Sequence, residues 1–234
     1  MLSVVDLLRA GTVDRPLASY LVGAMRKGVS VLVGANPGGA GKTTVMAALL
    51  NFLPDDTTIQ PVEGRAVLER GRRDTDYGKT CYLAHEIGDG AYYAYLWGRD
   101  VRIFFSLAAA GHIIASNLHA DTLSETQEQL CDVNGVDPHH LNAVELKIYL
   151  RVGGRGLRRD RWLSHVYECD GEEDRLIWRG ERVNAFSRQA DSAIVGEDDR
   201  AFWQDFLADL DAKDIHTIEG VRRAVVHSGE GAGR

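Results

Sequence analysis

Apolar and polar residues follow two different periods along the chain, and both predict regular structure. Short apolar runs rich in β-branched residues predict strands at residues 29–33, 58–62, 80–84 and 111–119. Apolar residues spaced three and four positions apart predict helices at residues 4–10, 17–26, 42–53, 91–97, 101–110 and 122–134. Strands that alternate with helices form a mainly parallel sheet flanked by helices, so we expect an α/β fold.

The pattern changes near the end of this alternation. Residues 64–78 are polar and predict a solvated loop, whereas residues 144–152, 162–168 and 176–179 alternate at period two and predict an antiparallel extension. Residues 184–196 have little periodicity and predict a linker, and residues 197–211 and 217–226 predict two short amphipathic helices. We therefore expect a main domain at residues 1–183, a helical appendage at 184–227 and a disordered tail at 228–234.

A glycine-rich loop joins the strand at residues 29–33 to the helix that begins at Lys42. Its glycines allow a tight path that turns backbone N–H groups inward, and the dipole of the following helix favours an anion there. Lys42 would reach the β- and γ-phosphates of a nucleotide, and the Thr43 hydroxyl would bind Mg²⁺. The predicted nucleotide-binding residues are Asn36, Pro37, Gly38, Gly39, Ala40, Gly41, Lys42, Thr43 and Thr44.

One position departs from the usual pattern of such P-loops, G-x-x-x-x-G-K-[ST]. Asn36 stands where the first glycine is expected, and Gly34 lies two residues earlier. Asn is the non-glycine residue that best tolerates a left-handed backbone, so we expect the cradle to keep its shape. The alternative is a glycine-rich turn with a surface lysine, and the coincidence of strand, glycines, Gly-Lys-Thr and helix argues against it.

Acidic and histidine side chains stand at the ends of the predicted strands. Glu63 follows the strand at residues 58–62, and His85 and Glu86 follow the strand at residues 80–84. A carboxylate at such a strand end can orient Mg²⁺ or an attacking water molecule. His112 and His119 bracket the strand at residues 111–119; one such histidine is usually structural, but a pair raises the expectation of a site. The candidate catalytic residues are Glu86, Glu63, His119 and His112.

Net charge and cysteine content indicate which partners and which cellular compartment to expect. The chain has 27 Lys and Arg against 34 Asp and Glu, a net charge of −7, which argues against binding to nucleic acid or to an anionic membrane surface. Cys81, Cys131 and Cys169 form no C-x-x-C pair, which argues against a disulfide framework and a zinc site. No segment resembles a signal peptide or reaches the roughly 18 apolar residues of a membrane helix. We expect a soluble protein of a reducing cytoplasm.

The order of these motifs resembles the type II/IV secretion ATPase superfamily, and most closely its archaeal pilus, archaellum and secretion motor branch. The resemblance rests on the segment at residues 6–34, the P-loop, the acids Glu63 and Glu86, Gly111-His112 and Leu118-His119-Ala120-Asp121. Residues 158–168 and 215–221 also look like the family's C-terminal region. The resemblance implies a RecA-like ATPase domain, and we expect the family's usual N-terminal domain to be missing.

The resemblance also implies roles and partners. Lys42 and Thr43 would be the Walker A lysine and Mg²⁺ ligand, Glu63 the last acid of the Asp box, Glu86 the Walker B glutamate, and His119 the His-box histidine with His112 as its companion. Such proteins hydrolyse ATP with Mg²⁺ as hexameric rings, docked on a polytopic membrane protein at the inner face of the membrane. An arginine of the neighbouring subunit usually completes the site. The segment that carries such arginines holds Arg65, Arg70, Arg72 and Arg73 here.

Several departures from the family's pattern keep alternatives open. The Asp box is reduced to residues 60–63, His85 stands where the family has Gly, and Gly88 stands where it has Arg. These changes favour nucleotide binding over fast hydrolysis, so the alternative to a motor ATPase is a nucleotide-binding regulatory or structural paralogue. A P-loop small-molecule kinase is a third hypothesis, which requires an arginine-bearing lid over an acceptor.

Overall fold

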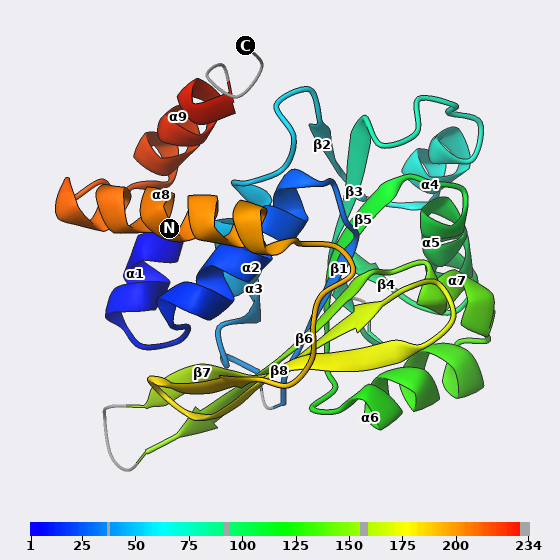
Figure 1. Cartoon of the computed structure of the whole chain (residues 1–234). Coiled ribbons are helices and arrows are strands. Elements are labelled where there is room, and N and C mark those ends of the chain that lie inside the picture. The colour runs from blue at the N-terminus through cyan, green and yellow to red at the C-terminus, as the bar shows by residue number, and fades with distance from the viewer. Residues whose placement is uncertain (37, 91–93, 155–158, 230–234) are drawn as a thin grey trace.

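A computed structural model of the chain describes residues 1–36, 38–90, 94–154 and 159–229. Within these residues nine strands form one sheet in the order β2-β3-β5-β1-β6-β7-β8-β9, and β4 pairs with β3 (Figure 1). The strands are β1 (Val31–Gly34), β2 (Thr58–Pro61), β3 (Thr80–Ile87), β4 (Tyr95–Leu96), β5 (Ile113–Leu118), β6 (Leu146–Gly153), β7 (Asp160–Cys169), β8 (Asp174–Arg182) and β9 (Ala185–Arg188).

The sheet has a parallel part and an antiparallel part. From β2 to β6 every pair of neighbours is parallel, including the β4–β3 pair. From β6 to β9 every pair is antiparallel. The predicted α/β fold, a mainly parallel sheet with an antiparallel extension, is therefore confirmed.

Helices cover both faces of the sheet (Figure 1). They are α1 (Val4–Arg9), α2 (Arg15–Arg26), α3 (Lys42–Leu50), α4 (Arg65–Gly71), α5 (Arg99–Ala109), α6 (Leu123–Gln127), the π-helix η1 (Glu128–Val133), α7 (Pro138–Asn142), α8 (Glu197–Ala212) and α9 (Ile218–Gly229). Val31 and Val33 pack in a core with α1, α2, α3 and α8, whereas Leu32 belongs to a second core with α4, α5 and α7. The apolar run of β1 is continuous because the strand is buried on both faces.

None of the helices in the described part of the chain has the length and apolar content that a bilayer crossing requires. All three cysteines are free thiols, and burial raises the pKa of Cys81 to about 12. A thiol with so high a pKa stays protonated near neutral pH and is a poor nucleophile.

Two predicted elements between β2 and α5 are wrong. The solvated loop at residues 64–78 contains α4, because Leu68 is fully buried and an added Cβ at Gly71 would lie 2.8 Å from the Tyr82 ring. Packing against the sheet thus outweighs the polar character of the segment. Of the helix predicted at residues 91–97, Tyr95–Leu96 is the strand β4, which pairs with the end of β3, and residues 91–93 lie outside the described residues.

The C-terminal region differs from the prediction at its start. The linker predicted at residues 184–196 contains β9, which pairs with β8 at the edge of the sheet. The side chains of β9 are half-buried or exposed, so the segment lacks a clear alternation. The two predicted helices are present as α8 and α9, and α9 includes Ser228, where a tail is predicted; residues 230–234 lie outside the described residues. The division into a main domain and an appendage stays a prediction.

Gly34 determines how closely the end of β1 approaches the segment after β5. An added Cβ at Gly34 would lie 2.5 Å from the carbonyl oxygen of Ala120 and 2.8 Å from the Tyr149 ring. Neither neighbour can move easily, because one is backbone and the other is a buried side chain whose hydroxyl lies 2.7 Å from Thr126 Oγ1. The strand can approach residue 120 only because residue 34 has no side chain.

The substitution Gly34→Ala is therefore expected to lower the free energy of unfolding by roughly 1–3 kcal/mol, the usual cost of overpacking. Gly196→Ala is the control for an added methyl group without overpacking, since its φ is −70° and an added Cβ there meets nothing within 4 Å. Gly196 is the N-cap of α8, so this variant is expected to lose only about 0.5 kcal/mol. Urea unfolding of the two variants and the parent measures the difference. An unchanged midpoint for Gly34→Ala would contradict the close approach at Ala120.

Candidate functional site

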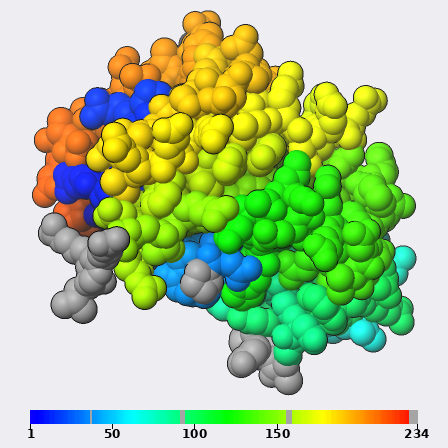
Figure 2. All heavy atoms as spheres, turned by 90° about the horizontal axis from the view of Figure 1, so that it is seen from below, coloured from blue at the N-terminus to red at the C-terminus, as the bar shows by residue number. Residues whose placement is uncertain are grey.

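The P-loop links the end of β1 to the start of α3. Gly39 and Gly41 have φ values of 81° and 102°, in the left-handed region that favours glycine. An added Cβ at Gly38 or Gly39 would meet nothing within 4 Å, and the N-terminus of α3 has no side-chain cap. Figure 2 shows the blue atoms of this stretch at the centre of one face of the molecule. The loop is therefore open, and the backbone N–H groups at the N-terminus of α3 have no side-chain cap. Pro37 lies outside the described residues.

Lys42, Glu86 and His119 meet at the carboxyl ends of the parallel strands. Lys42 Nζ lies 3.0 Å from Glu86 Oε1 and donates to the carbonyl oxygen of Ala35 at 3.2 Å. His119 Nδ1 is 3.4 Å from Lys42 Nζ, and His119 Nε2 is 3.5 Å from Glu86 Oε1. The structure thus brings together three residues that the sequence places on three different elements.

The ion pair between Lys42 and Glu86 is nearly buried. The two side chains are 6% and 9% exposed, whereas that of His119 is 37% exposed. Among the described residues, Glu86 Oε1 has no hydrogen-bond partner besides its ionic contacts with Lys42 and His119. A buried carboxylate loses its hydrogen bonds to water, and where the protein does not replace all of them the carboxylate readily binds a cation or a proton donor. The pair therefore supplies a cation for an anionic ligand and an acceptor for a proton.

Asn117 connects the P-loop to β3 and is a site residue that the sequence alone did not indicate. Its Nδ2 donates to the carbonyl oxygen of His85 at 3.0 Å and lies 3.4 Å from Thr43 Oγ1. Asn117 is 3% exposed, and its Oδ1 has no partner among the described residues. A polar residue near the end of an apolar strand is the signal that could have found it. Asn117 aligns β3 and β5 beside the exposed Thr43.

Asp121, which follows β5, binds the backbone at the start of the P-loop. Its Oδ1 accepts from the backbone N–H of Asn36 at 2.7 Å, and its Oδ2 lies 3.9 Å from Arg151 Nη1. Its own backbone N–H donates to Glu125 Oε2 at 2.7 Å, which fixes the carboxylate at the start of α6. The position of Asn36, which replaces the usual glycine, is therefore set by a side chain that follows β5.

The remaining candidate residues lie apart from this group. Glu63 follows β2 at the same edge of the sheet, where it is exposed and borders a pocket with His85. His112 precedes β5 and packs against Tyr77 and Tyr82, with ring centroids 5.0 and 5.3 Å away. At about 3.3 Å of rise per residue, β5 separates His112 from His119 by roughly 20 Å. The structure therefore does not bring His112 to the P-loop.

Four arginines of the segment singled out in the sequence lie in or just after α4: Arg65, Arg70, Arg72 and Arg73. Arg65 Nε is 2.7 Å from Asp100 Oδ1, and no contact joins any of the four to the P-loop within the described residues. Arg161 of β7 does reach the loop, because its Nη2 donates to the carbonyl oxygen of Gly39 at 3.4 Å. The arginine at the loop of this chain thus comes from the antiparallel part of the sheet.

The described residues contain no group of three or more His, Cys, Asp or Glu that could hold a metal ion by themselves. A Mg²⁺ ion that accompanies a nucleotide takes most of its ligands from phosphates and water, with few protein ligands. The exposed Thr43 hydroxyl and the incompletely satisfied Glu86 carboxylate suit that requirement. The donor set therefore fits Mg²⁺ bound together with a nucleotide.

No family model and no curated protein matches the chain. Among solved structures, the VirB11 ATPase from the Brucella suis type IV secretion system, in complex with sulphate, is 21% identical over 70% of this chain and 54% of its own, with a TM-score of 0.48. The Legionella pneumophila ATPase DotB is 12% identical over 89% of this chain and 54% of its own, with a TM-score of 0.42. The chain spans about half the length of either structure, and similarity at this level assigns it no activity.

The hydrogen bond from Asn36 to Asp121 generates a prediction about the loop. For the nucleotide expected from the sequence, Asp121→Ala is expected to weaken binding about tenfold, because a hydrogen bond to a charged group contributes roughly 1.5–3 kcal/mol and its loss frees the loop. Asp132→Ala, at an exposed position of η1, is the control. Titration calorimetry with ATP and Mg²⁺ measures the affinities, and equal affinities for both variants would exclude a role of Asp121 in positioning the loop.

Proposed function

We propose that this chain binds ATP with Mg²⁺ at the P-loop and hydrolyses it. The observation that carries the proposal is the buried pair of Lys42 and Glu86, 3.0 Å apart beside an open glycine-rich loop. Phosphoryl transfer to water needs a cation that neutralises the γ-phosphate and a carboxylate that orients the nucleophile. Both charges stand at the start of α3, where phosphate oxygens would accept from the uncapped N–H groups.

The side chains divide the chemistry by position. Lys42 leaves Glu86 for the β- and γ-phosphates, and the freed Glu86 carboxylate then orients the attacking water and takes its proton. His119, partly exposed and 3.5 Å from Glu86, stands where it can donate to the γ-phosphate. The Thr43 hydroxyl would hold Mg²⁺, which would neutralise charge on the phosphate oxygens. Glu63 is proposed as an outer acid at the same edge of the sheet, and His112 has no part in the reaction.

We further propose that the chain is a motor subunit of a type IV pilus-like or type II/IV secretion-like machine. The support is the order of motifs from the segment before the P-loop to Asp121, which resembles that family and most closely its archaeal branch. By this resemblance the active form is a hexameric ring at the cytoplasmic face of a membrane, docked on a polytopic membrane protein. A neighbouring subunit would then supply the arginine that α4 does not bring to the site of its own chain.

Two substitutions separate binding from catalysis. Lys42→Ala is expected to reduce ATP binding below detection, because it removes the cation that faces the β- and γ-phosphates. Glu86→Gln is expected to retain binding and to lower turnover by at least a hundredfold, since the amide cannot accept the proton of water. Lys79→Ala, at an exposed lysine, is the control, and thermal melting monitors the fold. Turnover at the parental rate in Glu86→Gln would contradict the assigned role.

A regulatory or structural paralogue without turnover is the second candidate function. It is favoured by the four arginines of the α4 segment, none of which contacts the P-loop within the described residues; Arg65 instead pairs with Asp100. The two functions differ in how ATP hydrolysis depends on protein concentration. A ring whose site is completed by a neighbour predicts specific activity that rises as subunits assemble, whereas a regulator predicts ATP binding with no hydrolysis at any concentration.

A further inference from the structure

A cavity of about 300 Å³ lies beside the P-loop and is not part of the Lys42–Glu86 site. The backbone of Gly39, Ala40 and Gly41 forms one of its walls, so it shares the loop with the phosphate site. Lys42, Glu86 and His119 do not line it. The loop therefore has two sides, one with the carboxylate and histidine and the other with this cavity. A volume of this size lies at the lower end of small-molecule sites in proteins.

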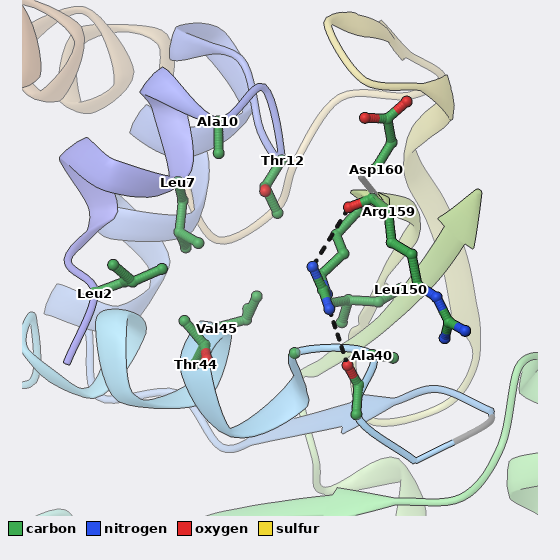
Figure 3. A pocket seen from close by; sticks show the side chains of 13 residues that line it. Leu2, Leu7, Ala10, Thr12, Ala40, Thr44, Val45, Leu150, Arg159 and Asp160 are labelled. Atoms are coloured by element: carbon green, nitrogen blue, oxygen red, sulfur yellow. Dashed lines mark hydrogen bonds between the residues drawn. The ribbon is translucent and has the colours of Figure 1, made fainter. Parts of the chain in front are cut away.

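The other walls of the cavity differ in chemistry (Figure 3). Leu2, Leu7 and Ala10 line it from the N-terminal segment and α1, and Val45 lines it from α3. Leu2 is 50% exposed at this place, an apolar side chain without full cover. The opposite wall belongs to the β6–β7 hairpin and is made by Leu150, Arg159, Asp160 and Arg161. A flat apolar ligand with a polar edge matches aliphatic groups on one side and guanidinium groups on the other.

The guanidinium group of Arg161 is anchored at the boundary between the cavity and the P-loop. Nη2 donates to the carbonyl oxygen of Gly39 at 3.4 Å, and Nη1 donates to the carbonyl oxygen of Arg159 at 3.4 Å, as the dashed lines of Figure 3 show. An arginine plane that is fixed at two points can stack on the face of a nucleobase without further loss of side-chain freedom. Asp160 and Thr12 bring polar groups to the same cavity.

We propose that this cavity takes the nucleobase of the bound nucleotide, an inference that rests on the proposed function of the P-loop. A triphosphate in the loop places its γ-phosphate toward Lys42 and Glu86, so the nucleoside must leave on another side. The cavity begins at the same glycines and continues along Thr44 and Val45, directly after Thr43. Leu2 and Leu7 contact one face of the base, and Arg161 stacks on the other. The base thus closes the gap between α1 and the β6–β7 hairpin.

Filling the cavity tests this assignment. Ala10→Phe places a ring where the base is expected, at an exposed residue with ordinary helical backbone angles, and Ala201→Phe on α8 is the matched control. Titration calorimetry compares ATP with inorganic tripolyphosphate, both with Mg²⁺. The Ala10 variant is expected to bind ATP at least about tenfold more weakly and to bind tripolyphosphate as the parent does. Equal affinities for ATP in the parent and both variants would overturn the base site while leaving the phosphate site intact.

Photolabelling of the parent protein locates the base independently of that variant. 8-Azido-ATP is expected to label peptides that contain residues 2–12 or 159–161, the two walls of the cavity. Labelling confined to peptides that contain none of the residues lining the cavity would overturn the assignment. A parent protein that binds neither ATP nor tripolyphosphate would contradict both the base site and the proposed function, so the two failures are distinguishable.

Discussion

A buried ion pair at the start of α3 is the constraint on which the rest of the site depends. Lys42 and Glu86 come from different elements, lie 3.0 Å apart and expose less than a tenth of their side chains. Two charges in such surroundings are stable together, because removal of one leaves the other without water and without a counter-ion. A ligand that draws Lys42 away must therefore provide Glu86 with a new partner, either a cation or a hydrogen-bond donor. This exchange of partners links ligand binding to the release of a catalytic carboxylate.

The order of the strands explains why these groups meet. β3, β5 and β1 are neighbours in the parallel part of the sheet, so Glu86, His119 and the P-loop share one edge. β6 extends the parallel part beside β1, and β7 then brings Arg161 to the opposite side of the loop. One side of the P-loop therefore has the charged groups of Lys42 and Glu86, and the other side has a largely apolar cavity. A nucleotide matches this arrangement, because its phosphates are charged and its base is flat and largely apolar.

The local parts of this arrangement could be predicted from the sequence, since strand, P-loop and helix are contiguous and their spacing is diagnostic. The contacts that support the loop could not, because they join residues far apart in the chain: 74 positions for Thr43 and Asn117, and 85 for Asn36 and Asp121. His112 illustrates a different limit. Both ends of a strand look equivalent in a sequence, but only one end of β5 reaches the P-loop, and His112 instead packs among aromatic rings.

A crystal structure of the chain with Mg²⁺ and a non-hydrolysable ATP analogue would show whether Lys42 exchanges Glu86 for phosphate. We expect Lys42 Nζ to lie within hydrogen-bonding distance of the β- or γ-phosphate. We also expect the separation between Lys42 Nζ and Glu86 Oε1 to exceed the present 3.0 Å. An analogue bound away from the loop, with Lys42 still paired to Glu86, would contradict this exchange of partners.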